Sequence, residues 1–145
     1  MVIKNEMKYN GTVVLTYRIE YPQFRSLINQ TVLGPINLYY MEMAMRYQQV
    51  CETELYNMAV QQYRQSIENN FPFHAYEALM VYKITLIHSC VISLYQDKYQ
   101  YTGGAHGSTV RSSQTWLTTR GSMLRLRQLY TCPMDYQEYI FNEII

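Results

Sequence analysis

The chain has 145 residues, 48% of them apolar, and its 12 basic and 11 acidic side chains leave a formal net charge of +1. This length suits one domain that buries about two-thirds of the unfolded chain's surface, and the ordinary apolar content argues against intrinsic disorder. Near-neutral charge argues against a nucleic-acid-binding protein, so we expect no nucleic-acid partner. No apolar run approaches the roughly 20 residues of a membrane-spanning helix. We therefore expect any membrane attachment to use a segment outside this sequence.

The first predicted elements are a strand and a long helix. Residues 12–21 alternate and predict a strand with one buried face, which ends at Pro22. The helix follows Gly34-Pro35, because proline fits a first helical turn. Its apolar stripe recurs at steps of three and four and consists of Ile36, Tyr40, Met43, Tyr47, Cys51, Leu55, Met58 or Ala59, Tyr63 and Ile67. A helix of roughly 50 Å is expected to bend or break along its length.

Alternation with a period of two returns after Pro72 and predicts further strands. They cover residues 75–86, 88–96, 109–118 and 123–126, with a break near residue 88 and turns at residues 103–107 and 119–122. Residues 134–145 have helical spacing, and their apolar pattern runs to the last residue, so we expect the chain to be truncated there. The fold class is α+β: one long helix packed on an antiparallel sheet, with a short C-terminal helix.

The three cysteines, Cys51, Cys90 and Cys132, have no paired spacing. An odd number cannot form a complete intrachain disulfide framework, and the spacing does not fit a zinc ribbon. We expect these cysteines to be buried and to pack like small apolar residues, without a redox role. One disulfide and a free thiol would also fit.

The sequence offers little for catalysis or metal binding. The glycine-rich residues 103–107 are followed by a predicted strand, whereas a phosphate-binding loop needs a helix N-terminus there. His74, His88 and His106 lack zinc-site spacing. His88 and Cys90 would share a strand face, but an apolar strand disfavours a thiolate. We therefore expect no metal, no cofactor, no catalytic residue and no enzymatic activity.

Two features indicate a binding surface. Tyr95, Tyr99 and Tyr101 alternate into the glycine turn and should line one sheet face, where exposed rings could stack on sugars or anchor a protein. Alternation over residues 124–127 places Arg125 and Arg127 together on one strand face. Five cations occur between residues 98 and 134 without an acidic residue, namely Lys98, Arg111, Arg120, Arg125 and Arg127. This basic surface is either solvated or a site for an anionic partner.

Residues 99–107 read Tyr-Gln-Tyr-Thr-Gly-Gly-Ala-His-Gly, and residues 120–122 and 128–130 follow as Arg-Gly-Ser and Gln-Leu-Tyr. This pattern resembles the non-catalytic extracytoplasmic region of PdaC-type peptidoglycan deacetylases and RsiV-type anti-sigma factors. The chain departs from that pattern at Gln128, which replaces the usual acid. The resemblance implies an α+β module of the cell envelope that acts outside the membrane, and in the anti-sigma relatives such a region binds lysozyme.

On this resemblance we expect residues 1–110 to be a PdaC-like N-terminal module. Residues 111–145 would begin an adjoining, truncated RsiV-like C-terminal module, and the two would form one compact unit. The expected function is a non-enzymatic, extracytoplasmic binding or sensing module of a bacterial cell-envelope protein. The expected partner is a cell-wall glycan related to peptidoglycan, or a lysozyme-like protein. The candidate ligand-binding residues are Tyr99, Tyr101, Gly103, Gly104, His106, Arg125 and Arg127.

Two other functions fit the sequence. The chain could be a structural accessory domain of a peptidoglycan deacetylase, with no ligand of its own. It could also be a hydrolase that uses His106 or His88.

Overall fold

The computed structural model describes residues 1–25, 30–129 and 136–144. In this part of the chain, one six-stranded sheet has its strands in sequence order. The strands are β1 (Val2–Tyr9), β2 (Thr12–Glu20), β3 (Tyr76–His88), β4 (Val91–Tyr101), β5 (Ser108–Leu117) and β6 (Ser122–Leu124). The β2 and β3 strands are parallel, and every other neighbouring pair in this sheet is antiparallel.

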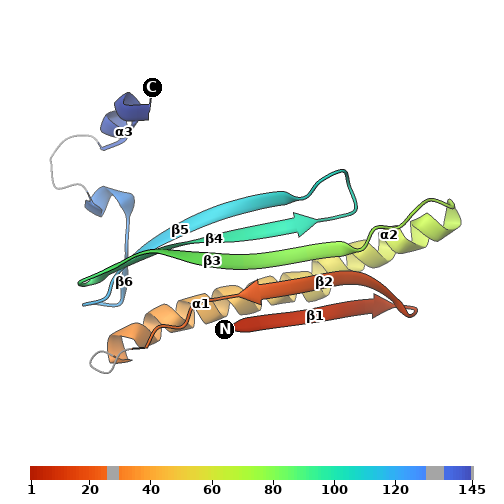
Figure 1. Cartoon of the computed structure of the whole chain (residues 1–145), viewed down its shortest axis with the longest axis horizontal. Coiled ribbons are helices and arrows are strands. Elements are labelled where there is room, and N and C mark those ends of the chain that lie inside the picture. The colour runs from red at the N-terminus through yellow and green to blue at the C-terminus, as the bar shows by residue number, and fades with distance from the viewer. Residues whose placement is uncertain (26–29, 130–135, 145) are drawn as a thin grey trace.

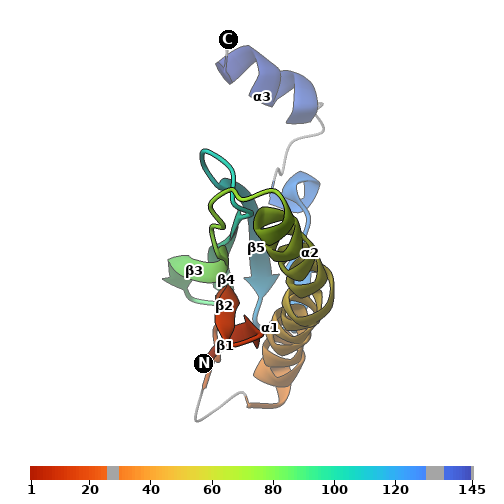
Figure 2. The ribbon, with the colours of Figure 1, turned by 90° about the vertical axis from the view of Figure 1, so that its right-hand side faces the viewer.

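A long helical segment connects the two parallel strands, which need a crossover rather than a hairpin. It consists of α1 (Gln30–Val50), a π-helical turn (Cys51–Leu55) and α2 (Tyr56–Glu68). A 3₁₀ helix (Leu126–Leu129) and α3 (Tyr136–Ile144) follow the sheet. Figure 1 shows the long helix running along the sheet, and Figure 2 shows it against one side. The predicted α+β fold class, with one long helix and a short C-terminal helix, is confirmed.

The β1 strand was missed in the sequence, where no element was predicted before residue 12. Its signal is the Asn10-Gly11 pair, which is typical of a two-residue hairpin turn because both central residues need a positive φ. Asn10 has a φ of 49° and Gly11 a φ of 82°. The hairpin adds β1 to the free edge of β2.

A helix of this length was expected to bend or break, and the π-helical turn at Cys51–Leu55 interrupts it. The buried positions Tyr47, Cys51, Leu55 and Ala59 follow one another in steps of four, whereas an α-helix advances one turn in 3.6 residues. A π-helical turn contains more residues per turn, and here the amide of Tyr56 bonds the carbonyl of Cys51. We infer that this wider turn keeps the four side chains directed at the sheet.

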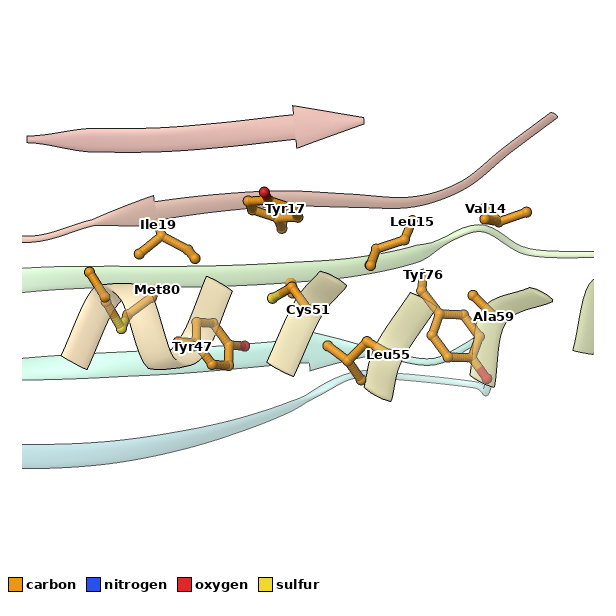
Figure 3. Packing of buried hydrophobic residues seen from close by; sticks show 12 residues of the cluster. Val14, Leu15, Tyr17, Ile19, Tyr47, Cys51, Leu55, Ala59, Tyr76 and Met80 are labelled. Atoms are coloured by element: carbon orange, nitrogen blue, oxygen red, sulfur yellow. The ribbon is translucent and has the colours of Figure 1, made fainter. Parts of the chain in front are cut away.

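The larger part of the core lies between this stripe and the strands β2 and β3. Leu15, Tyr17, Ile19, Ala78 and Met80 are buried on the sheet side, and Figure 3 shows several of them facing the helix. The predicted burial of the strand at residues 12–21 is confirmed for its central positions.

A second buried cluster lies at the other end of the sheet, where the start of α1 covers β4 and β5. Its centre is Tyr40, which is fully buried and lies edge-on to the ring of Trp116. The Trp116 Nε1 donates a hydrogen bond of 2.7 Å to the Tyr40 hydroxyl. A buried indole N–H without a partner would be costly, so this bond fixes how the helix sits on the last long strand.

Replacing Tyr40 by phenylalanine tests this bond, because Tyr40→Phe keeps the ring and leaves the Trp116 N–H unpaired. We expect a loss of about 1–3 kcal/mol in the free energy of unfolding, measured by urea denaturation. The matched control is Tyr39→Phe, at a half-buried ring that also contacts Trp116. Equal stability of the two variants would contradict the structural role of the bond.

Alkaline pH tests the burial of the core tyrosines. Burial raises the pKa of Tyr17, Tyr40 and Tyr47 to about 12, and the hydrogen bond to Glu52 adds to the shift at Tyr17. These hydroxyls ionise near pH 10 in the unfolded chain. Their contribution to stability is therefore complete below pH 10 and is lost as the pH rises toward about 12.

The measurement follows tyrosinate absorbance together with urea unfolding across that range. We expect a late absorbance phase in the folded protein that moves to about pH 10 in urea. A single phase near pH 10 in the folded protein would contradict the burial.

Candidate ligand-binding face of the sheet

The sheet face turned away from α1 and α2, called here the outer face, carries the candidate site. Strand register places on it Lys4, Glu6, Thr16, Arg18, Glu77, Leu79, Val81, Lys83, Tyr95, Asp97, Tyr99, Tyr101, Thr109 and Arg111. Figure 2 shows the long helix along one side of the sheet, and these positions alternate along the strands with the buried residues that face it.

Three tyrosines form a row along β4 on this face. Tyr95 pairs with Lys83, Tyr99 with Leu79, and Tyr101 with Glu77 on β3. All three tyrosines are half-buried. The expectation that alternate tyrosines before the glycine turn line one sheet face is confirmed by this register.

A shallow depression lies beside the row, over β1, β2 and β3. Its side chains on the outer face are Lys4, Glu6, Thr16, Arg18, Glu77 and Leu79. Register brings Leu79 and Glu77 next to Tyr99 and Tyr101. The depression and the last two tyrosines therefore form one continuous surface.

The ion pair between Arg111 and Asp97 lies beside Tyr95, the first tyrosine of the row. The Arg111 Nε and Nη2 donate hydrogen bonds of 2.7 and 2.8 Å to the two carboxylate oxygens of Asp97. The Arg111 guanidinium also lies 3.9 Å from the ring centroid of Tyr95. Hydrogen bonding to Arg111 lowers the pKa of Asp97. Because the guanidinium covers one face of the Tyr95 ring, Tyr99 and Tyr101 are the better candidates for stacking.

The position of the Tyr99 ring accounts for the glycine at residue 107, the last of the motif. A Cβ atom at Gly107 would lie 2.3 to 2.6 Å from the Cε2, Cζ and Oη atoms of Tyr99. The Tyr99 ring therefore packs directly on the backbone of residue 107, where any other residue would displace it. The Tyr99 carbonyl meanwhile accepts a 3.2 Å hydrogen bond from the hydroxyl of Tyr47 on α1.

The glycine turn, residues 102–107, also contacts the long helix. Gly103 has a φ of 80°, a conformation that favours glycine. A Cβ atom there would come within 3.0 Å of the side-chain amide of Gln62 on α2. The turn is thus placed by Gln62 on one side and by Tyr99 on the other.

His106 is exposed at the tip of the turn, with its Nδ1 3.2 Å from the carbonyl oxygen of Gly107. Gly104 is exposed as well. The turn leads directly into β5 and not into a helix, as the sequence predicted. Tyr99, Tyr101, Gly103, Gly104 and His106 therefore lie together at one end of the outer face, and their role in ligand binding stays a prediction.

The structure does not bring Arg125 and Arg127 to this group. The predicted strand over residues 123–126 ends at Leu124, so the expected alternation of arginines and leucines is wrong. The Arg125 amide donates to the Gln128 side chain, and the Gln128 amide donates to the Arg125 carbonyl, which closes a 3₁₀ turn. Figure 1 shows β6 at the opposite end of the sheet from the connection between β4 and β5.

The predicted basic surface is also wrong, because its cations face different ways. Lys98 lies on the helix side of β4, with its Nζ 5.2 Å from the ring centroid of Tyr47. Arg111 lies on the outer face and is paired with Asp97. A strand alternates its side chains between two faces, so a run of cations in the sequence does not become one patch.

Other chemistries find little support among the residues that the structure describes. No group of three or more histidine, cysteine or acidic side chains is placed to hold a metal ion in this part of the chain. Cys51 is buried and free, and burial raises the pKa of its thiol to about 12. Cys90 is also free and lies in the turn after β3, so it does not share a strand face with His88. Cys132 lies outside the described residues.

Within the described part of the chain, no helix has both the length and the apolar content needed to cross a bilayer.

The fold and the outer face define an α+β domain with a helix on one side of its sheet and an uncovered tyrosine row on the other. The sequence profile of the family described as "Deacetylase PdaC" matches residues 9–109. The chain belongs to the PdaC family, which confirms the resemblance found at the glycine turn.

Two solved structures of DUF3298 family proteins are similar to this chain, and no curated protein matches it. The protein from Bacteroides fragilis has 16% identity and a TM-score of 0.71, and the match covers 99% of this chain and 65% of that one. The protein from Pseudomonas aeruginosa has 15% identity and a TM-score of 0.49, with 99% and 62% covered. The chain therefore spans about two-thirds of the length of each relative.

Replacing Gly107 by alanine tests the packing of Tyr99. The added methyl group overlaps the ring, so we expect Gly107→Ala to cost about 1–3 kcal/mol in the free energy of unfolding. The matched control is Gly104→Ala, where a Cβ atom would meet nothing within 4 Å. Chemical denaturation measures both variants, and a Gly107→Ala protein as stable as Gly104→Ala would contradict the contact.

Proposed function

We propose that this domain is a non-enzymatic binding module of a bacterial cell-envelope protein, and that its outer face binds a peptidoglycan-related glycan outside the membrane. The observation that carries the proposal is the half-buried pair Tyr99 and Tyr101 beside the depression over β1 to β3. The extracytoplasmic location rests on the family resemblance.

The composition of the outer face supports an uncharged, hydroxyl-rich ligand. Aromatic rings give a large apolar contact area, and the tyrosine hydroxyl adds a hydrogen-bonding group. The depression contains two carboxylates, one lysine and one threonine, which can exchange hydrogen bonds with sugar hydroxyls: Glu6, Glu77, Lys4 and Thr16. A sugar ring that packs on Tyr101 would have these groups within the same surface.

The ion pairs of the outer face favour a glycan over a strongly basic protein. Both arginines already bind carboxylates there: Arg18 lies 2.6 Å from Glu20, and Arg111 lies 2.7 Å from Asp97. Lys4 and Lys83 add positive charge to the same face. Such a mixed surface lacks the negative field that would steer a basic lysozyme-like protein.

Calorimetric titration tests the proposal with three probes: an uncharged N-acetylglucosamine oligomer, a purified muropeptide, and lysozyme. We expect the glycan probes to bind. We expect Tyr101→Ala to weaken their affinity about fivefold, since one aromatic contact contributes about 1 kcal/mol.

The matched control is Tyr56→Ala, at a half-buried tyrosine of α2 that contacts β1 and not the outer face. Equal weakening by Tyr56→Ala would show that general destabilisation, not a contact, causes the loss. Binding of lysozyme without glycan binding would replace the glycan by a protein ligand. Absence of heat with all three probes would favour the alternative, a structural accessory domain of a deacetylase with no ligand of its own.

A further inference from the structure

The β3 strand is much longer than its neighbour β2. Pairing between them ends at Ile19 and Met80, whereas β3 continues to His88. Pro22, two residues after the end of β2, has no N–H to donate and disfavours a continuation of that strand. Figure 1 shows β3 and β4 running on together beyond the end of β2.

We call residues 82–88 the β3 edge. One side of this segment pairs with β4. On the other side, no backbone hydrogen bond to any described residue is found. Seven residues in extended conformation therefore present a row of N–H and C=O groups that another strand can complete.

The side chains of the β3 edge are mostly apolar and exposed. Ile84 is 37% exposed, Leu86 46% and Ile87 65%. A bulge between Ile84 and Leu86 directs apolar side chains to both faces of the sheet. The segment carries one permanent charge, that of Lys83, which has no ion-pair partner among the described residues.

We propose that the β3 edge accepts an extended peptide strand of a partner protein, with apolar residues beside Ile84 and Ile87 and a carboxylate opposite Lys83. Main-chain hydrogen bonds would hold the peptide, as in other cases where a strand is added to a sheet edge. The carboxylate follows from charge complementarity, because opposite charges stabilise a cross-strand pair and like charges destabilise it.

A second copy of this chain fits the β3 edge less well. The segment Tyr-Lys-Ile-Thr-Leu-Ile-His contains no acidic residue to meet Lys83. If two copies paired through this edge, the bulge of one copy would lie opposite the bulge of the other. Lysines and bulges on an edge strand both oppose association with an identical edge. A flexible peptide can adjust its backbone opposite one bulge, whereas two folded edges cannot.

Titration of the labelled protein with synthetic peptides, followed by amide chemical shifts, tests this proposal. The probes are two nine-residue peptides of alternating valine and threonine, with either glutamate or lysine at the central threonine position. We expect shifts concentrated in the amides of residues 82–88. We expect the glutamate peptide to bind about fivefold more tightly than the lysine peptide, and Lys83→Glu to reverse this preference.

The substitution Ile87→Lys should weaken binding of both peptides at least fivefold, because it replaces the apolar contact at Ile87 with a solvated charge on the strand edge. Its matched control is Ile67→Lys on α2, since Ile67 is 64% exposed and Ile87 65%. Circular dichroism confirms that both variants fold.

Three results would overturn the proposal: unshifted amides at residues 82–88 with both peptides, equal affinity for the two peptides, or a dimer in sedimentation experiments that buries these amides. Lys83 also lies on the outer face, but Tyr99 and Tyr101 lie outside the β3 edge, so Tyr101→Ala should leave peptide binding unchanged and separates this result from glycan binding.

Discussion

The packing of one helix face against one sheet face determines the rest of this structure. Side chains in steps of four, from Tyr47 to Ala59, meet the buried residues of β2 and β3, and the π-helical turn at Cys51–Leu55 lets them do so within a continuous helix. The bond between Trp116 and Tyr40 extends the same contact to β5. Because one helix covers only one side, the opposite side of the sheet is left to the solvent or to a ligand.

The same contact also positions the glycine turn relative to the outer face. Tyr47 on the helix bonds the carbonyl of Tyr99, whose ring packs on Gly107, while Gln62 limits the space at Gly103. Three residues of the motif, Tyr99, Gly103 and Gly107, are thus required by packing. Their recurrence within a family does not by itself imply ligand contact, and this is why the tyrosines, rather than the glycines, are the informative positions for binding.

Local patterns in the sequence predicted the helix, most strands and the shared face of Tyr99 and Tyr101, because each depends on a repeat of two or nearly four residues. The Asn10-Gly11 pair indicates a hairpin turn. The residues before it do not alternate clearly between apolar and polar side chains, so β1 was not predicted. Arg125 and Arg127 were misplaced for a different reason. A 3₁₀ turn closed by the Gln128 side chain ends the strand, and alternation cannot reveal such a competing hydrogen bond.

The outer face and the β3 edge are two consequences of one arrangement, and they suit different partners. A sheet face offers side chains, which select a ligand by shape and by its polar groups. A strand edge offers backbone groups, which select only another strand and leave discrimination to a few neighbours such as Lys83. A second helix on the outer face would cover its side chains. A longer β2 would pair with the β3 edge and occupy its backbone groups. The chain has neither in its described residues, so the domain presents two chemically distinct surfaces, a sheet face and a strand edge, that meet at Lys83.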